Sequence, residues 1–447
     1  MSRTILISGS SAINGKISVP GDKSISHRVA MLASVASGRS RIEGFATSAD
    51  CRSTLGCLRR LGITIEEASD HLVIHGNGLG GYRIEGETVW LDSGNSGSTM
   101  RMLSGLLAAH PFRTHFDGDL SLRRRPMGRI IEPLRQMGCH IEAREGNLPP
   151  LIIRGGALDA ISYSSPVASA QVKTCVLFAG LHAKGTTMFR EPALSRNHTE
   201  LMLAEFGARF NEREHDSGRV LAIEGGAELT PVDYRVPGDL SSASFFIAAA
   251  TLIQGSSILI QDVNLNPTRS AFLDVLESLG ANILREDVRS RHGEMVGNLR
   301  ITSSALHSNP GGTIISGAVI ANLVDELPIL AVVATRVEGR VDVRDARELR
   351  IKESDRIRSV VDGIRELGGK IDEFEDGFSI SGPQQLTGGR IETSGDHRIA
   401  MAFTVAGLIS SGVTEISDAD CVEVSFPEFY DLMSGVSTEG SIIKGSM

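Results

Sequence analysis

Six apolar stretches rich in small residues recur along the chain, and each begins with a polar cluster. They read DKSISHRVAMLASVASG, GNSGSTMRMLSGLLAAH, SAQVKTCVLFAGLHAKG, DLSSASFFIAAATLIQG, DELPILAVVATRVEG and DHRIAMAFTVAGLISSG. They start about 70 to 85 residues apart, an interval that suits a small α/β unit and is too long for a solenoid repeat. Because apolar residues occur all round each stretch, each predicts a helix of three or four turns that is buried on every side.

A second phrase follows each of these stretches and supports the same sixfold division. The six copies read LRRLGITI, LRQMGCHIEA, LAEFGARF, LESLGANI, IRELGGKI and, most weakly, YDLMSGVST. Each is typical of an amphipathic helix that ends at a glycine and leads into a strand. The motif VPGD occurs at Val19–Asp22 and again at Val236–Asp239, each time before a group of three units. We therefore expect the chain to cross between two domains at these Pro-Gly turns.

Composition indicates a soluble globular protein of the cytoplasm. Of 447 residues, 41% are hydrophobic and 22% are charged, and nowhere do 18 apolar residues follow one another. We therefore expect neither export nor membrane insertion. The five cysteines show no CxxC or zinc spacing, which favours a reducing compartment over a disulfide framework. A net charge of -9 argues against nucleic acid as the main partner.

Three motifs with known chemistry do not hold in their context. GNGLGG at 76–81 leads into the alternating YRIEGETVWLD, so it predicts a hairpin turn and not a dinucleotide site, which needs a helix there. GDKS at 21–24 lacks the first glycine of a phosphate-binding P-loop. The twelve histidines form no i, i+4 pair with a plausible third ligand, so metal catalysis has no positive support.

Cationic residues gather in short phrases at or near the predicted helix starts, where free N–H groups and the helix dipole favour anions. Any one phrase is more commonly an N-cap or a solvated ion pair. Lys352 and Arg356, for example, are four apart and are expected to share one face of a helix, with Glu353 adjacent. Several such phrases together, with Asp325 and Glu353 as additional carboxylates, favour a substrate with phosphate and carboxylate groups and a proton-transfer step.

The phrases PGDKSISHR, GNSGSTMR, RRRPMGR, ASAQVK, NPTR, DELPILAV, LRIKESDR, DHRIAMAF and SFPEF resemble, in this order, those of the 5-enolpyruvylshikimate-3-phosphate (EPSP) synthase family. The resemblance spans nearly the whole chain. It implies an α/β fold of two domains, each with three βαβαββ units round buried helices, and an active site in the interdomain cleft. It also implies that residues 20–236 form one domain, and that residues 1–19 and 237–447 form the other.

The resemblance implies transfer of the enolpyruvyl group of phosphoenolpyruvate to the 5-hydroxyl of shikimate 3-phosphate, by addition and elimination through a tetrahedral intermediate. No cofactor and no metal are implied, and a monomer is expected. The catalytic residues would be Asp325, Glu353 and Lys23. The residues that bind shikimate 3-phosphate would be Lys23, Ser24, Arg28, Ser169, Ala170, Gln171, Arg196, Asp325 and Lys352. Those that bind phosphoenolpyruvate would be Lys23, Gly97, Arg125, Gln171, Lys352, Arg356 and Arg398.

Some positions depart from the pattern of many family members. Val424 stands before SFP, where many members have lysine. Arg196 stands in a stretch where the other branch of the family uses different residues, and ASAQVK has alanine where that branch repeats serine. The chain therefore resembles the second, divergent bacterial branch, which is often described as tolerant of the inhibitor glyphosate. Gly97 in NSGS leaves room for that inhibitor, so we expect appreciable glyphosate sensitivity. Two alternatives are a UDP-N-acetylglucosamine enolpyruvyl transferase, whose Lys-Asn pair and loop cysteine are missing here, and a non-catalytic anion-binding scaffold.

Overall fold

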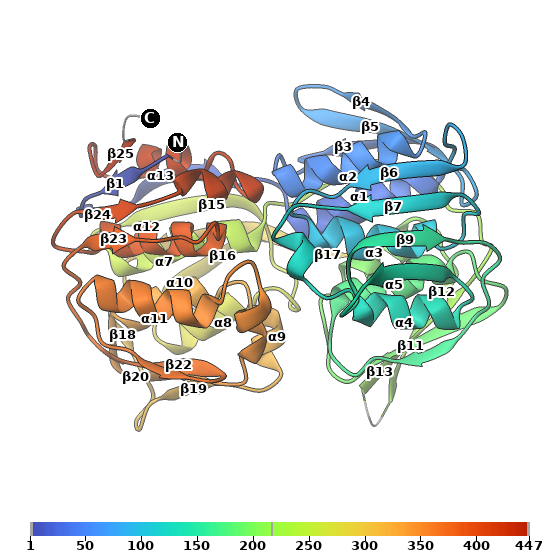
Figure 1. The fold of residues 1–447 in the computed structure, drawn as a ribbon. Helices are drawn as coiled ribbons and strands as arrows, with labels where there is room; N and C mark the ends of the chain where they lie inside the picture. Colours follow the sequence, from blue (N-terminus) through green and yellow to red (C-terminus); the bar gives the residue numbers. More distant parts are fainter. Residues whose placement is uncertain (1–2, 216–217, 445–447) are drawn as a thin grey trace. The chain divides into compact units, whose positions relative to one another are not determined.

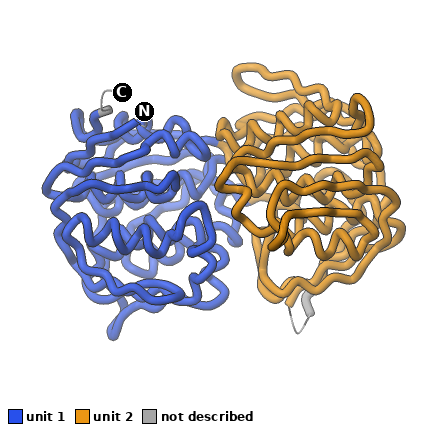
Figure 2. Tube along the Cα trace, viewed as in Figure 1, with its two compact units in different colours: residues 1–20, 237–290, 295–447 blue, residues 21–236, 291–294 orange. Residues whose placement is uncertain are grey.

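The structure, a computed structural model, describes residues 3–215 and 218–444. The described chain divides into two compact units, coloured separately in Figure 2. Unit 1 comprises the residues up to Pro20, the segment Pro237–Ser290 and the residues from Met295 onward. Unit 2 comprises Gly21–Val236 and the short segment Arg291–Glu294.

Unit 2 contains three four-stranded sheets, in the orders β14-β3-β5-β4, β6-β7-β9-β8 and β10-β11-β13-β12 (Figure 1). Its strands are β3 (Ser37–Glu43), β4 (Thr64–Glu67), β5 (His71–Asn77), β6 (Thr88–Asp92), β7 (Arg113–Asp117), β8 (His140–Arg144), β9 (Leu148–Arg154), β10 (Ser162–Ser164), β11 (Thr186–Glu191), β12 (Phe210–His215), β13 (Gly218–Glu224) and β14 (Tyr234–Arg235). Its helices are α1 (Lys23–Val35), α2 (Ala49–Arg60), α3 (Gly97–Leu107), the 3-10 helix η1 (Leu122–Arg124), α4 (Gly128–Gln136), α5 (Ala170–Gly180) and α6 (His198–Glu205).

Unit 1 contains the other three sheets, in the orders β16-β17-β15-β2, β18-β20-β22-β21 with β19 also on β20, and β23-β24-β1-β25. Its strands are β1 (Ile5–Ile7), β2 (Asn14–Ser18), β15 (Ser257–Asn264), β16 (Asn282–Arg291), β17 (Glu294–Thr302), β18 (Leu306–His307), β19 (Thr313–Ile315), β20 (Val337–Val343), β21 (Asp372–Phe374), β22 (Gly377–Gly382), β23 (Gly389–Ile391), β24 (Thr414–Ile416) and β25 (Ile442–Lys444). Its helices are α7 (Leu240–Leu252), α8 (Ala271–Ser278), α9 (Val319–Leu323), α10 (Leu327–Ala334), η2 (Arg347–Ile351), α11 (Arg356–Glu366), α12 (His397–Leu408), η3 (Ala419–Val424) and α13 (Phe429–Val436).

The six sheets repeat one strand pattern, which confirms the predicted six βαβαββ units. In each, a first strand runs parallel to a second, and the second pairs antiparallel with a third, as in β6, β7 and β9. Three of the units borrow a strand from elsewhere in the chain. β14 completes the sheet of β3, β2 completes that of β15, and β1 pairs antiparallel with both β24 and β25.

The six predicted central helices are confirmed as α1, α3, α5, α7, α10 and α12. They are buried nearly all round: every residue of α12 is buried, and so is every residue of α7 from Leu240 to Thr251. Polar side chains cap the N-termini of most of these helices. The side chains of Asp22 and Asp396, for example, accept hydrogen bonds from backbone N–H groups of α1 and α12. Among the described residues, no helix combines the length and apolar character needed to cross a bilayer.

The outer helices follow the second sequence phrase. α2 stops at Gly62 (φ 81°) and α11 stops at Gly368 (φ 80°), left-handed backbone that favours glycine. The weakest phrase differs, because α13 runs through Gly435 and is followed by Ser437 with an extended backbone.

Two local predictions are wrong. The segment 76–81 is no hairpin turn, because β5 and β6 on either side belong to different sheets. Lys352 and Arg356 do not share a helix, because η2 ends at Ile351 and α11 begins at Arg356 after the cap Asp355. The Asp355 side chain accepts a hydrogen bond from the backbone N–H of Arg358, which fixes the later helix start.

The turn between β16 and β17 belongs to unit 2, although both strands lie in a sheet of unit 1. In this turn His292 stacks on Tyr234, with ring centroids 4.3 Å apart, and its Nδ1 lies 2.8 Å from Glu205 Oε1. Glu294 Oε1 lies 2.7 Å from His198 Nδ1, and both side chains are fully buried. None of the quoted sequence motifs indicates this crossing of the chain.

Candidate active site

In unit 2, the N-terminal turns of α1, α3 and α5 lie close together. The Gln171 amide at the start of α5 accepts a hydrogen bond from Arg101 (2.9 Å) and donates one to Ser98 (2.9 Å), both on α3. Arg28 on α1 donates to the hydroxyl of Thr174 on α5 (3.2 Å). The positive ends of three buried helices therefore face one edge of the unit, where they favour an anion.

Arg28 is buried and held from two sides at this edge. Its Nε donates to Thr199 Oγ1 (2.7 Å), and a terminal nitrogen donates to the Ser24 carbonyl (2.8 Å). Burial lowers the pKa of Arg28 to about 10; the charge of Glu200 opposes this shift, and the charge of Arg196 adds to it. Two cations close enough to disfavour each other form a suitable site for a dianion such as a phosphate group.

Lys23, the first residue of α1, forms an ion pair with Asp50 on α2 at 3.0 Å. The Lys23 side chain retains 23% exposure, so its ammonium group reaches the surface of unit 2. His27, one turn further, is fully buried, and its Nδ1 lies 2.7 Å from the Thr54 hydroxyl. Burial and the charges of Lys23 and Arg28 hold the pKa of His27 well below its usual value. Of the three basic side chains in the phrase PGDKSISHR, His27 is therefore the one that stays neutral.

The remaining predicted positions of unit 2 lie in or beside the same helix starts. Arg125 follows η1 and donates to Asn95 Oδ1 (2.9 Å), just before α3 begins. Gly97 is the first residue of α3, and a Cβ there would lie 2.7 Å from a terminal nitrogen of Arg101. The Ser169 side chain caps α5, and Ala170 is the first residue of that helix.

In unit 1, Arg356 binds three carboxylates at the start of α11. Its Nε donates to Asp396 (2.8 Å), one terminal nitrogen pairs with Glu353 at 2.7 Å, and the other lies 3.5 Å from Asp325. The guanidinium is 2% exposed, whereas the Asp325 and Glu353 side chains are 22% and 21% exposed. The structure thus brings the two predicted acid-base residues together on one buried cation while both still reach solvent.

Charge pairing outweighs burial in this cluster. Burial alone would lower the pKa of Arg356, but Asp396 and Glu353 raise it above its usual value. Burial alone would likewise raise the pKa of Asp396, whereas Arg356 lowers it. Asp396 is therefore the permanent anion that fixes Arg356, which leaves Asp325 and Glu353 as the more accessible carboxylates.

The other two predicted residues of unit 1 differ in burial. Arg398, on the first turn of α12, is 5% exposed, and its guanidinium donates to the Ser241 carbonyl at 3.5 Å. Lys352 is 24% exposed, and its ammonium nitrogen lies 3.9 Å from Glu348 on the preceding turn. Both stand within the sequence segments that carry Asp396 and Glu353.

Sequence reasoning missed three ion-pair partners of the site. Arg269, in the phrase NPTR, is 3% exposed and pairs with Asp239 (3.1 Å) and Glu326 (3.3 Å), with Asp325 at 4.0 Å. Asp396 is the first residue of the phrase DHRIAMAF but has no predicted role, and Asp50 lies outside all of the quoted phrases. NPTR marked Arg269 as notable, but nothing in the sequence connects it with the start of α10.

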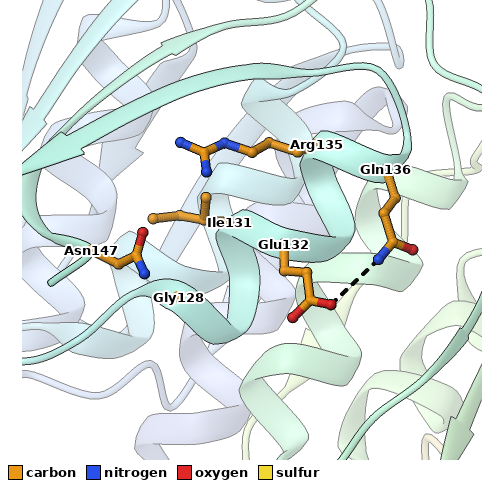
Figure 3. Close-up of a pocket in the computed structure, with 6 residues that line it drawn as sticks. All are labelled: Gly128, Ile131, Glu132, Arg135, Gln136 and Asn147. Carbon is orange, nitrogen blue, oxygen red and sulfur yellow. Dashed lines mark hydrogen bonds between the residues drawn. The ribbon is translucent and has the colours of Figure 1, made fainter.

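A hollow of about 390 Å³ on α4 is separate from these residues (Figure 3). It is lined by Gly128, Ile131, Glu132, Arg135, Gln136 and Asn147, none of which is a predicted site residue. Gln136 donates a long hydrogen bond (3.5 Å) to Glu132, one turn earlier on α4. Nothing in this hollow resembles the convergent cations found at the helix starts.

The model of one family, EPSP synthase (3-phosphoshikimate 1-carboxyvinyltransferase), matches residues 7–433. The chain belongs to the EPSP synthase family. This result agrees with the family expected from the order of the sequence motifs. The chain is 50% identical over 431 residues to the 3-phosphoshikimate 1-carboxyvinyltransferase of Solibacter usitatus, covering 96% of this chain and 99% of the relative. It is 46% identical to that of Brevibacillus brevis, covering 95% and 98%.

The fold is also that of EPSP synthase. A solved structure of EPSP synthase from Acinetobacter baumannii matches with a TM-score of 0.87 and 37% identity, over the full length of both chains. Membership of the EPSP synthase family makes this chain a transferase of the shikimate pathway.

Proposed function

We propose that the helix starts of unit 2 hold shikimate 3-phosphate and that the Arg356 cluster of unit 1 provides the acid-base groups for its reaction with phosphoenolpyruvate. The buried cation Arg28, which is held by Ser24 at the start of α1, Thr174 on α5 and Thr199 on α6, supports the first half. The observation that carries the second is the contact of Arg356 with both Glu353 and Asp325, at 2.7 and 3.5 Å. A merely structural ion pair does not need two partly exposed carboxylates on one buried cation.

In the addition step, Asp325 takes the proton of the 5-hydroxyl, and the oxygen forms a bond with C2 of phosphoenolpyruvate. Glu353 gives its proton to the methylene carbon, which becomes a methyl group, and the tetrahedral intermediate results. In the elimination step, Glu353 takes a proton back from that methyl group, and the bond from C2 to the phosphate oxygen breaks with its electron pair leaving on the phosphate. The released phosphate then takes up the proton that Asp325 removed from the 5-hydroxyl, which restores both carboxyl groups. Lys23 stabilises the departing phosphate through its ammonium group.

Shikimate 3-phosphate is proposed to contact residues of both units. Those of unit 2 are Lys23, Ser24, Arg28, Ser169, Ala170, Gln171 and Arg196, and those of unit 1 are Asp325 and Lys352. Phosphoenolpyruvate is proposed to contact Lys23, Gly97, Arg125, Gln171, Lys352, Arg356 and Arg398. Arginine suits these anions because its planar fork grips carboxylate or phosphate oxygens in pairs.

Further expectations accompany this proposal. We expect glyphosate to inhibit the enzyme, because an alanine at position 97 would crowd the inhibitor and Gly97 does not. A Cβ at this position would lie 2.7 Å from a terminal nitrogen of Arg101, so the space beside Gly97 is narrow. We expect a monomer in the cytoplasm, where the five free cysteines remain reduced. We also expect the chain crossings at the two VPGD turns to separate two functional domains.

The test is phosphate release from phosphoenolpyruvate by the purified protein, with shikimate 3-phosphate or UDP-N-acetylglucosamine as the acceptor. We expect turnover with shikimate 3-phosphate alone. Turnover with UDP-N-acetylglucosamine alone would contradict the proposed acceptor. No release with either acceptor by the folded protein would favour the anion-binding scaffold.

A further inference from the structure

A buried ion cluster in unit 2 lies directly behind the proposed phosphate site. Lys173, on the second turn of α5, is fully buried, and its Nζ lies 3.2 Å from Glu191 Oε1 and 2.6 Å from Glu200 Oε1. The Lys173 ammonium also donates to the Ser195 carbonyl (3.3 Å), and the Ser195 hydroxyl donates to Glu191 (2.5 Å). The two carboxylates are 0% and 3% exposed, so water does not screen this cluster.

The surroundings of Lys173 make its charge notable. The residues of α5 from Val172 to Gly180 are all buried, and beyond Thr174 the helix carries only apolar or small side chains. An aliphatic side chain would fill this position without the cost of desolvating an ammonium group. Packing alone therefore does not account for a lysine here.

The contacts of Lys173 lead to both proposed phosphate-binding arginines. The Ser195 carbonyl that it holds is in the residue before Arg196, so the cluster fixes the backbone from which Arg196 extends. Glu200, on the first turn of α6, follows Thr199, whose hydroxyl accepts the Nε hydrogen bond of Arg28. Lys173 thus connects the supports of two cations that come from separate segments of the chain.

We propose that Lys173 is a positioning residue for the phosphate group of shikimate 3-phosphate. It fixes the segment from Glu191 to Glu200 on α5, so that Arg196 and the Thr199-supported Arg28 are in place before the substrate arrives. Lys173 itself touches no substrate. This inference rests on the proposed function, because it assumes that Arg28 and Arg196 receive that phosphate group.

The experiment compares Lys173→Met with Lys184→Met in the full-length protein. Lys184 is an exposed lysine just after α5, so its substitution removes the same charge outside the cluster. We expect Lys173→Met to raise the dissociation constant and the KM for shikimate 3-phosphate by about tenfold to a hundredfold, because small displacements of binding groups have effects of this order. The KM for phosphoenolpyruvate at saturating shikimate 3-phosphate should change less than threefold, and Lys184→Met should match the wild type.

A second variant keeps the test decisive if Lys173→Met does not fold. Glu200→Gln preserves the side-chain shape and leaves Lys173 paired with Glu191, and we expect it to raise the dissociation constant of shikimate 3-phosphate while sparing that of phosphoenolpyruvate. A folded variant of either kind with wild-type affinity for shikimate 3-phosphate overturns the inference alone. Equal losses for both substrates also overturn it, because they indicate a general structural role. A wild-type protein that does not bind shikimate 3-phosphate overturns the proposed function itself, and the inference with it.

Discussion

At the scale of single residues, partners decide what each basic side chain does. Lys23, His27 and Arg28 stand within six residues of one another, yet Lys23 is partly exposed beside Asp50, His27 is neutral and buried, and Arg28 is a buried cation. The sequence predicted the cluster correctly as a concentration of charge. It did not distinguish these three states, because each depends on side chains from other helices.

The pH dependence of stability tests the state of His27. In the unfolded chain the histidine takes up a proton below about pH 6.5, whereas in the folded chain its lowered pKa prevents this. Stability from this residue is therefore present above pH 6.5 and is lost as the pH falls, by about 1.4 kcal/mol per pH unit. In urea unfolding at pH 6.5 and 5.5, the wild type should lose about 1 kcal/mol more than His27→Gln, because the unfolded histidine is already half-protonated at pH 6.5. Equal losses in both proteins would show that His27 is protonated in the folded state.

The two carboxylates on Arg356 differ in their proposed steps, and single-turnover kinetics separates them. Asp325→Ala should slow formation of the tetrahedral intermediate by about 10² to 10⁴-fold and leave its decay unchanged. Glu353→Gln, which keeps a hydrogen-bonding group for Arg356, should slow both formation and decay. Rapid quenching with measurement of the intermediate gives both rates. Slowed decay in Asp325→Ala would reverse the assignment of roles.

At the scale of elements, the repeat was predictable because each helix carries its own signals. Apolar residues all round, a polar cap and a terminal glycine are local features, so the six central helices could be placed from the sequence. The end of η2 at Ile351 and the pairing of Arg269 with Asp239 depend on tertiary contacts. The four-residue spacing of Lys352 and Arg356 therefore predicts one helical face, whereas in the structure η2 ends before Lys352 and α11 begins only at Arg356.

The close approach of α3 and α5 depends on Gly105, and substitution tests this. A Cβ at Gly105 would lie 2.2 Å from the Cys175 carbonyl oxygen of α5, a backbone atom that cannot turn aside. We expect Gly105→Ala to lower the free energy of unfolding by about 1 to 3 kcal/mol, although alanine favours a helix. Gly56→Ala in α2 is the matched control, since no atom lies within 4 Å of its Cβ position. It should stabilise the protein by about 0.5 to 1 kcal/mol in the same urea titration.

At the scale of the whole molecule, the two ends of the chain meet in one sheet. β1 lies between β24 and β25, with Ile5 opposite Ile416 and Ile7 opposite Ile442. Ile5 and Ile7 are fully buried, whereas Leu6 between them faces the other side of the sheet and is half-buried. The first strand is therefore an interior part of unit 1 and not an extension.

Substitutions on β1 test this role. Ile7→Ala removes buried methyl groups that contact the site of Gly407 on α12, and should cost about 2 to 5 kcal/mol of stability. Leu6→Ala on the same strand should cost less than half as much. Thermal unfolding measures the difference, and limited proteolysis should cleave the Ile7→Ala variant near β25 first. Equal melting temperatures for the two variants would indicate that β1 is only loosely attached.

This arrangement sets the order in which the protein is completed during synthesis. The ribosome releases β1 first, yet both of its partners are made more than 400 residues later. His198 likewise emerges 96 residues before Glu294, its buried partner. Domains generally fold as units in order of synthesis, but here β1 and the buried side chain of His198 are paired only with residues from the second half of the chain. A nascent chain of this enzyme thus carries the three apolar residues of β1 without either neighbouring strand until β24 and β25 have been made.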